Sequence, residues 1–251
     1  MADVENLPYH GGTAVVGVTL DGDRPQMNGD SPQWNYEVFA KMKENSIDYR
    51  LYLVTDEPSA YRRDFVEMVE AAVMGGVTVV QYRDTESNGR TAFARARRLQ
   101  DMLKLHGVPL VVNNDVGLAL ALGAEGIHVG QGDLPIEVVR RLVGPKMEIG
   151  LSLTCLDDVR PDELRWADLV GIGPVWDARK TKADAAPAMG PKGFAEIARR
   201  AGLPNVAIGG ITLETLPQAI SAGAQGVAVV SAFSRVDDPT VAARAFGAWF
   251  Q

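Results

Sequence analysis

The sequence predicts a closed eight-stranded (β/α)8 barrel, and a repeated unit in the chain is the main reason. Three times an amphipathic run ends on glycine, enters a short apolar strand and finishes on polar residues; the copies begin at Gly75, Gly123 and Gly223. Glycine ends a helix by accepting the left-handed backbone conformation, and such apolar strands are typical of a parallel sheet buried on both faces. The repeat therefore indicates a barrel whose chemistry lies at the carboxyl ends of its strands.

The segments that follow residue 47 alternate in the order that a complete barrel needs. Amphipathic runs such as residues 64–74, 90–106 and 239–249 are expected to be helices. A doubly wound open sheet is the weaker alternative. The expected strands are residues 50–54, 77–82, 109–112, 126–129, 147–151, 169–172, 205–208 and 226–230.

Residues 1–47 differ from this pattern, and we expect them to form an N-terminal extension to a catalytic domain of residues 48–251. They contain a β-like segment at 13–20 and a candidate helix at 33–45 that follows Ser-Pro. A short lid, an oligomer contact and a helix that plugs the barrel floor all remain open.

Composition narrows the class of partner. The formal net charge of -7 offers no basic surface for nucleic acid. No apolar run reaches the roughly 20 residues of a membrane helix, and the first residues lack the pattern of a signal peptide. The one cysteine, Cys155, excludes an internal disulfide, fits a reducing compartment and is expected to be a small buried side chain. We therefore expect a cytoplasmic protein that acts on small phosphorylated molecules, with assembly into a homo-oligomer left open.

Polar residues after the second, third and fourth strands suggest a diphosphate and metal site. The guanidinium of Arg83, beside Gln81, matches paired phosphate oxygens, although an ion pair with Asp84 would also explain it. Carboxylates from two loops, residues 113–115 and Asp133, are a common way of holding Mg²⁺ against a pyrophosphate. Helix capping is the competing explanation for the first of these loops.

Glycines and cations after the sixth, seventh and eighth strands suggest a phosphate site. Gly209-Gly210 allows backbone N–H groups to approach an anion, and Val230-Ser231 precedes the next helix. A tight turn would require the same glycines. The cations of residues 179–182 either balance a bound anion or belong to a solvated loop.

His128 lies between two apolar residues on the fourth strand, and we expect it to be a packed core residue with a backbone partner rather than a catalytic group. No His/Cys cluster has zinc spacing, and no Gly-x-Ser-x-Gly motif is present.

Eight motifs stand in order at the expected strand ends: YLVTD (52–56), VQYRD (80–84), VNND (112–115), GIHVGQGD (126–133), GIGPV (171–175), TK (181–182), AIGGI (207–211) and VVSA (229–232). Together they closely resemble the thiamine-phosphate synthase (thiamine-phosphate pyrophosphorylase) family. The resemblance implies a TIM barrel that joins a hydroxymethylpyrimidine diphosphate to a thiazole phosphate, releases pyrophosphate and uses Mg²⁺.

The resemblance also implies roles for individual residues. Gln81, Arg83 and Asn113 match pyrimidine-diphosphate positions, and Ser152 matches a residue near the pyrimidine, whose ring helps to expel pyrophosphate through a carbocation-like state. Arg83, Ser152 and Lys182 are the residues expected to act in catalysis. The other implied positions are the metal ligands Asp133, Asn114 and Asp115, the phosphate contacts Thr181 and Lys182, and the thiazole-phosphate cradle Gly210, Val230 and Ser231.

The chain departs from the family pattern at three places. Thr85 stands where the family usually has lysine, Asn114 stands where it usually has aspartate, and the loop of residues 177–182 lacks one threonine and is one residue longer. A thiazole tautomerase paralogue is the alternative on the same barrel, but that family has a catalytic histidine where this chain has Thr154. A non-catalytic binder of thiazole phosphate or thiamine phosphate would fit the weakened diphosphate side.

Overall fold

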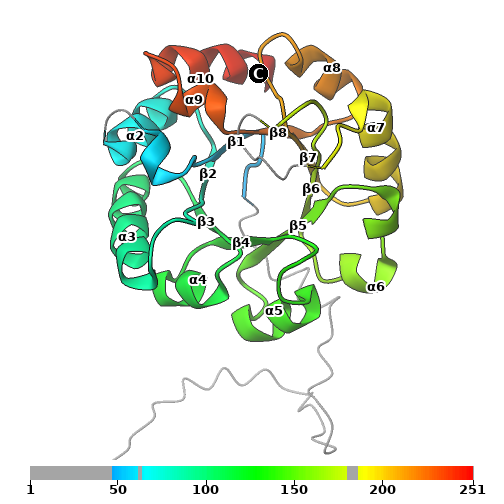
Figure 1. Cartoon of the computed structure of the whole chain (residues 1–251), viewed down its shortest axis with the longest axis horizontal. Helices are drawn as coiled ribbons and strands as arrows, with labels where there is room; N and C mark the ends of the chain where they lie inside the picture. Colours follow the sequence, from blue (N-terminus) through cyan, green and yellow to red (C-terminus); the bar gives the residue numbers. More distant parts are fainter. Residues whose placement is uncertain (1–46, 62–63, 180–185, 251) are drawn as a thin grey trace, which may run out of the picture. The chain divides into compact units, whose positions relative to one another are not determined.

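The structure, a computed structural model, describes residues 47–61, 64–179 and 186–250, all within the compact unit Met42–Gln251. Its strands form a closed barrel in which each pairs in parallel with the next and β8 pairs with β1 (Figure 1). The predicted (β/α)8 barrel is confirmed, whereas the expected segments at 13–20 and 33–45 lie outside the described residues. The strands are β1 (Leu51–Val54), β2 (Val79–Tyr82), β3 (Leu110–Asn113), β4 (Gly126–Val129), β5 (Glu148–Leu153), β6 (Leu169–Ile172), β7 (Asn205–Ile208) and β8 (Gly226–Val229).

Helices surround the strands on the outside of the barrel (Figure 1). Gly123 ends α4 in the left-handed conformation, as the repeat predicts, and Gly223 has φ of 98° just after α8. The expectation is wrong for Gly75, which ends α2 in a right-handed conformation with φ of -84°, while the positive φ of 110° falls on the next residue, Gly76. Among the described residues, no helix combines the length and the apolar character needed to cross a bilayer. The α-helices are α2 (Phe65–Met74), α3 (Gly89–Leu105), α4 (Val116–Leu122), α5 (Ile136–Val143), α6 (Pro161–Leu164), α7 (Gly190–Ala201), α8 (Leu216–Ser221), α9 (Ser231–Ser234) and α10 (Pro239–Gly247); the 3-10 turns are η1 (Pro58–Ala60), η2 (Leu156–Asp158) and η3 (Ala248–Phe250).

The inside of the barrel is a packed apolar core, and a buried carboxylate lies at the amino-terminal end of the strands, which we call the barrel floor. One cluster of this core takes one or two inward residues from most strands: Tyr52, Val54, Val79, Val111, Leu169, Val206 and Ala228. Beneath it, the Glu148 side chain accepts hydrogen bonds from the Ile47 N–H at 3.0 Å and the Tyr49 hydroxyl at 2.9 Å. Since Glu148 is only 6% exposed, these bonds replace water and attach the segment before β1 to the barrel floor.

Arg140, on α5, joins two loops on the amino-terminal side of the sheet, the one between α5 and β5 and the one between α6 and β6. Its guanidinium donates to the carbonyl oxygens of Gly144 at 2.9 Å, Met147 at 2.8 Å and Trp166 at 3.0 Å, and it pairs with Asp168 at 2.6 Å. The rigid guanidinium can donate to several acceptors at once, so this one side chain ties the two loops to α5.

One expectation about burial is wrong. Cys155 is exposed, because it follows β5 in the turn that leads into η2 and its side chain has no core to enter.

Candidate active site

The inner face of the barrel divides into a polar and an apolar sector at the rim, by which we mean the carboxyl ends of the strands and the residues directly after them. Alternate residues of a strand face the same side, so the residue two positions beyond a core residue also points inward. The last inward residues are polar on β2 to β5 and apolar on β7 and β8: Gln81, Asn113, His128 and Ser152, against Ile208 and Val230. The structure therefore brings three predicted substrate residues, Gln81, Asn113 and Ser152, into one sector.

Gln81 is held in place by a residue that sequence reasoning missed. Its Nε2 donates to the hydroxyl of Tyr52 at 2.8 Å, and both side chains are buried. Tyr52 belongs to the core below the rim, so this bond fixes the amide from beneath. A single tyrosine in the otherwise aliphatic strand β1 was the available signal.

Arg83 forms an ion pair at the rim, although not with the neighbour that we considered. Its guanidinium lies 2.5 Å from Oε1 of Glu57, and both side chains are about one-fifth exposed, at 23% and 18%. Asp84 pairs instead with Arg95 at 3.4 Å and accepts from the Tyr82 hydroxyl. The interpretation of Arg83 as a partner of Asp84 is therefore wrong, and Glu57 is a further residue that sequence reasoning missed.

Thr85 takes part in the same cluster. Both its N–H, at 2.9 Å, and its hydroxyl, at 2.7 Å, donate to the Glu57 carboxylate. Glu57 therefore offsets the charge of Arg83, while Thr85 contributes hydrogen bonds without a charge. This corner of the rim carries no net positive charge from these three side chains.

The two loops proposed for the metal are already partly occupied by local hydrogen bonds. Asp115 caps α4 by accepting from the Leu118 N–H at 2.8 Å, so the capping explanation holds for it. Asp133 Oδ2 accepts from the Gly130 N–H at 2.7 Å, while Asn114 is exposed and has φ of 61°. Among the described residues, no group of three or more His, Cys, Asp or Glu side chains forms a metal cage.

These donors nevertheless suit Mg²⁺, which prefers oxygen ligands and commonly takes one or two carboxylates together with waters and substrate phosphates. Asp115 accepts the Leu118 N–H through Oδ1 and Asp133 accepts the Gly130 N–H through Oδ2, so the other oxygen of each carboxylate can serve as a ligand. The donor set therefore fits a metal that a bound diphosphate completes.

His128 is buried as expected, but its partner is a side chain rather than the backbone. Its Nε2 lies 3.0 Å from the hydroxyl oxygen of Ser152, and its Nδ1 has no hydrogen-bond partner. Burial lowers the pKa of His128 to about 4, because a charged ring would lose its hydration there. The ring is therefore neutral near pH 7.

The glycine turn after β7 is explained by geometry and packing alone. Gly209 and Gly210 have φ of 93° and 64°, which favours glycine. A Cβ at Gly210 would lie 2.6 Å from Cβ of Trp176, and one at Gly209 would lie 2.5 Å from Cβ of Pro174. The alternative of a tight turn is thus sufficient, and the phosphate role of Gly210 remains a prediction.

The end of β8 is attached to β1 by a buried carboxylate. Ser231 begins the short helix α9, directly after Val230. At the other end of α9, the Ser234 hydroxyl donates to Asp56 at 3.0 Å, and Asp56 is only 4% exposed. This contact holds the predicted phosphate cradle against the first strand.

The loop after β6 is described only in part. Arg179 makes a two-point contact with Asp177, at 2.9 Å for each nitrogen, so its charge is locally balanced. The predicted residues Thr181 and Lys182 lie outside the described residues, and their roles stay predictions.

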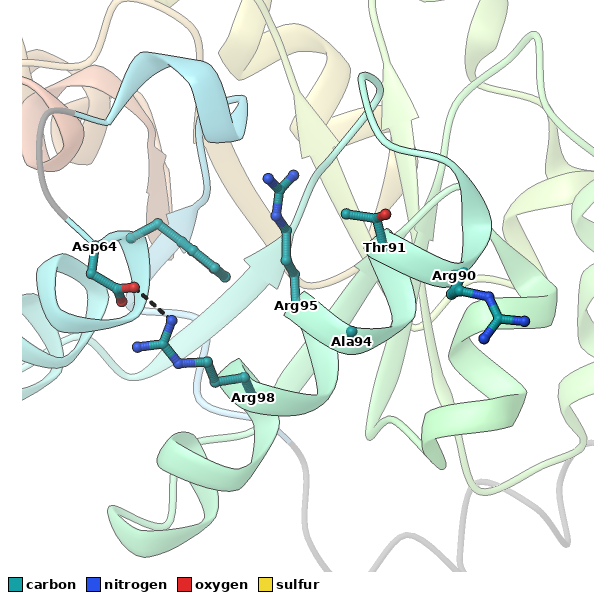
Figure 2. Close-up of a pocket in the computed structure, with 7 residues that line it drawn as sticks. Asp64, Arg90, Thr91, Ala94, Arg95 and Arg98 are labelled. Atoms are coloured by element: carbon teal, nitrogen blue, oxygen red, sulfur yellow. Dashed lines mark hydrogen bonds and ion pairs between the residues drawn. The ribbon is translucent and has the colours of Figure 1, made fainter.

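A cavity of about 550 Å³ lies between the amino-terminal end of α2 and the first half of α3, outside the ring of strands. Figure 2 shows Arg98 turned toward Asp64, where the two form an ion pair, whereas Arg90 is turned away. Arg95 is engaged with Asp84, so the arginines here do not converge on one point. We therefore assign the candidate site to the rim.

A TIM barrel with a polar sector and a glycine turn at the rim defines a class: barrel enzymes whose site lies at the carboxyl ends of the strands. A family profile described as thiamine monophosphate synthase matches residues 51–233, and this chain belongs to that family. It is accordingly a transferase of thiamine biosynthesis.

Individual relatives agree with the profile. Thiamine-phosphate synthase of Albidiferax ferrireducens is 44% identical over 194 residues, which are 77% of this chain and 88% of the relative. That of Chloroflexus aurantiacus is 43% identical over 198 residues, covering 79% and 91%. The solved thiamine phosphate pyrophosphorylase of Pyrococcus furiosus has a TM-score of 0.72 at 28% identity, covering 80% of this chain and 95% of its own.

Proposed function

We propose that this chain joins 4-amino-2-methyl-5-hydroxymethylpyrimidine diphosphate to a thiazole phosphate, giving thiamine phosphate and pyrophosphate. The bond between the pyrimidine methylene carbon and the diphosphate oxygen breaks, and its electron pair leaves on the diphosphate. The thiazole ring nitrogen then forms the new bond to that carbon. The observation that supports the proposal best is the meeting of Gln81, Asn113 and Ser152 in one polar sector of a barrel of this family.

The leaving diphosphate is the group with the greatest need for positive charge. Arg83 is the cation proposed to bind it, because a planar guanidinium suits paired oxygens. Arg83 is already paired with Glu57. A bound diphosphate would therefore either share the guanidinium with the Glu57 carboxylate or displace that carboxylate from it. Lys182, with Thr181, is proposed to supply further contacts from the loop after β6.

Mg²⁺ is the proposed cofactor, with Asp133, Asp115 and the carbonyl oxygen of Asn114 as its protein ligands. When bound, it would neutralise charge that develops on the leaving diphosphate. The chain's own residues bind and orient the two substrates: Gln81 and Asn113 on the pyrimidine side, and Gly210, Val230 and Ser231 around the thiazole phosphate. Holding both reactants in register accounts for much of the rate in such a condensation.

The experiment is to incubate the purified protein with both substrates and Mg²⁺ and to measure thiamine phosphate. Formation of product that stops when the metal is chelated supports the whole proposal. Binding of thiazole phosphate without any product would refute it and favour the non-catalytic binder. Arg83→Ala should abolish turnover, while Arg200→Ala, a control at an exposed cation paired with Glu196 on α7, should leave it nearly unchanged.

A further inference from the structure

The structure makes space for one imidazole ring inside the polar sector. A Cβ at Gly150 would lie 2.3 Å from Nδ1 of His128, and a Cβ at Gly171 would lie 2.9 Å from its Cε1. Only glycine at these two inward positions allows the ring to lie across β5 and β6. The ring is packed against backbone on that side, and its remaining polar contact is with Ser152.

The two ring nitrogens have different surroundings, and this difference determines which one carries the hydrogen. Nδ1 is buried and has no hydrogen-bond partner, while Nε2 is 3.0 Å from Oγ of Ser152. A buried N–H without a partner is costly, and such groups are rarer in proteins than under-used acceptors. The Nε2–H tautomer is therefore favoured, with Nδ1 as the unused acceptor.

This tautomer fixes the direction of the hydrogen bond. Nε2–H donates to Oγ of Ser152, so the serine hydroxyl hydrogen cannot point at the ring. It is left to donate elsewhere, toward the open side of the rim. We propose that His128 is a positioning residue that makes Ser152 a hydrogen-bond donor to an acceptor atom, a ring nitrogen, of the bound pyrimidine. The assignment of the pyrimidine as the ligand rests on the proposed function.

A donor hydroxyl on Ser152 would select among substrate rings. A substrate ring with a nitrogen lone pair facing Ser152 is accepted, whereas a ring that presents an N–H or C–H at the same place is disfavoured. Sites built around a buried hydrogen bond reject analogues that leave it unmade. Ser152→Ala and His128→Leu should each raise KM for the pyrimidine diphosphate roughly tenfold or more, with a smaller change in kcat.

The first test needs no substrate. The chain has three histidines, so nitrogen-15 NMR of the uniformly labelled full chain, with His128→Gln to assign the signals, reports which ring nitrogen of His128 is protonated. A protonated Nε2 with a bare Nδ1 is expected. A protonated Nδ1, or a doubly protonated ring near pH 7, would overturn the proposal.

The second test separates action through Ser152 from a purely structural effect. If His128 acts through Ser152, the double variant His128→Leu/Ser152→Ala should raise KM no further than Ser152→Ala alone. His128→Gln, which can place an amide N–H near the same point, should restore most of the lost affinity. Fully additive losses would contradict the proposal. His106→Gln, a change at an exposed histidine directly after α3, is the control and should leave KM unchanged.

Failure of the positioning role and failure of the proposed activity give different results. A wild-type chain that makes thiamine phosphate but shows additive losses would refute the positioning role alone. A chain that makes no product, and whose affinity for the pyrimidine diphosphate is unaffected by Ser152→Ala, would refute both.

Discussion

Replacing His128 by glutamine should make the protein less sensitive to mild acid. In the unfolded chain a histidine titrates near 6.5, whereas burial in the barrel lowers the pKa of His128 to about 4. Between these two values the unfolded state binds a proton that the folded state excludes. Unfolding is therefore favoured as the pH falls through this window, and the stability is fully present above it.

The size of the effect follows from the two pKa values. A difference of roughly 2.5 pH units corresponds to about 3 kcal/mol at the acid end of the window, and to about 2 kcal/mol near pH 5. Glutamine has no titrating group, so His128→Gln should lack this loss, even if the substitution lowers the stability at neutral pH.

Urea unfolding of both proteins at several pH values between about 7.5 and 5 measures the difference directly. The unfolding free energy of each protein is plotted against pH, and the two slopes are compared. The contributions of carboxylates that both proteins share cancel in this comparison. Equal losses of unfolding free energy in the two proteins, within about 0.5 kcal/mol, would show that the imidazole is not kept neutral by burial.

Three further substitutions test other parts of the structure. Arg140→Ala removes the hydrogen bonds that join two loops and should lower the unfolding free energy, measured by urea titration, by about 3 kcal/mol or more. Arg141→Ala, at an exposed cation on the same helix, should change it by less than about 0.5 kcal/mol. Gly171→Ala places a methyl group against the buried imidazole and should cost about 1–3 kcal/mol; an unchanged unfolding midpoint would contradict the packing. Thr85→Lys adds a cation beside Glu57 and should lower KM for the pyrimidine diphosphate severalfold at low salt and less at high salt; no salt dependence would count against a role in diphosphate binding.

The order of helices and strands was predictable from the sequence because each element depends on the hydrophobic pattern and the end residues of its own segment. All eight expected strands are present, and Gly123 and Gly223, unlike Gly75, have the positive φ expected of the repeat. Helix caps such as Asp115 were also visible in the chain, since a cap depends on residues within one turn. Strand ends gave the polar positions, because parallel strands of a barrel present their carboxyl ends at one rim.

The chain by itself thus determined the barrel, the family and the set of polar residues at the strand ends. Only the tertiary structure decided how those residues pair: Arg83 with Glu57, Gln81 with Tyr52, and the ring of His128 with Ser152. These partners come from neighbouring strands or from the loops that follow them. Their contacts depend on the register between strands and on the space left by glycines opposite them, which no periodicity within one segment encodes.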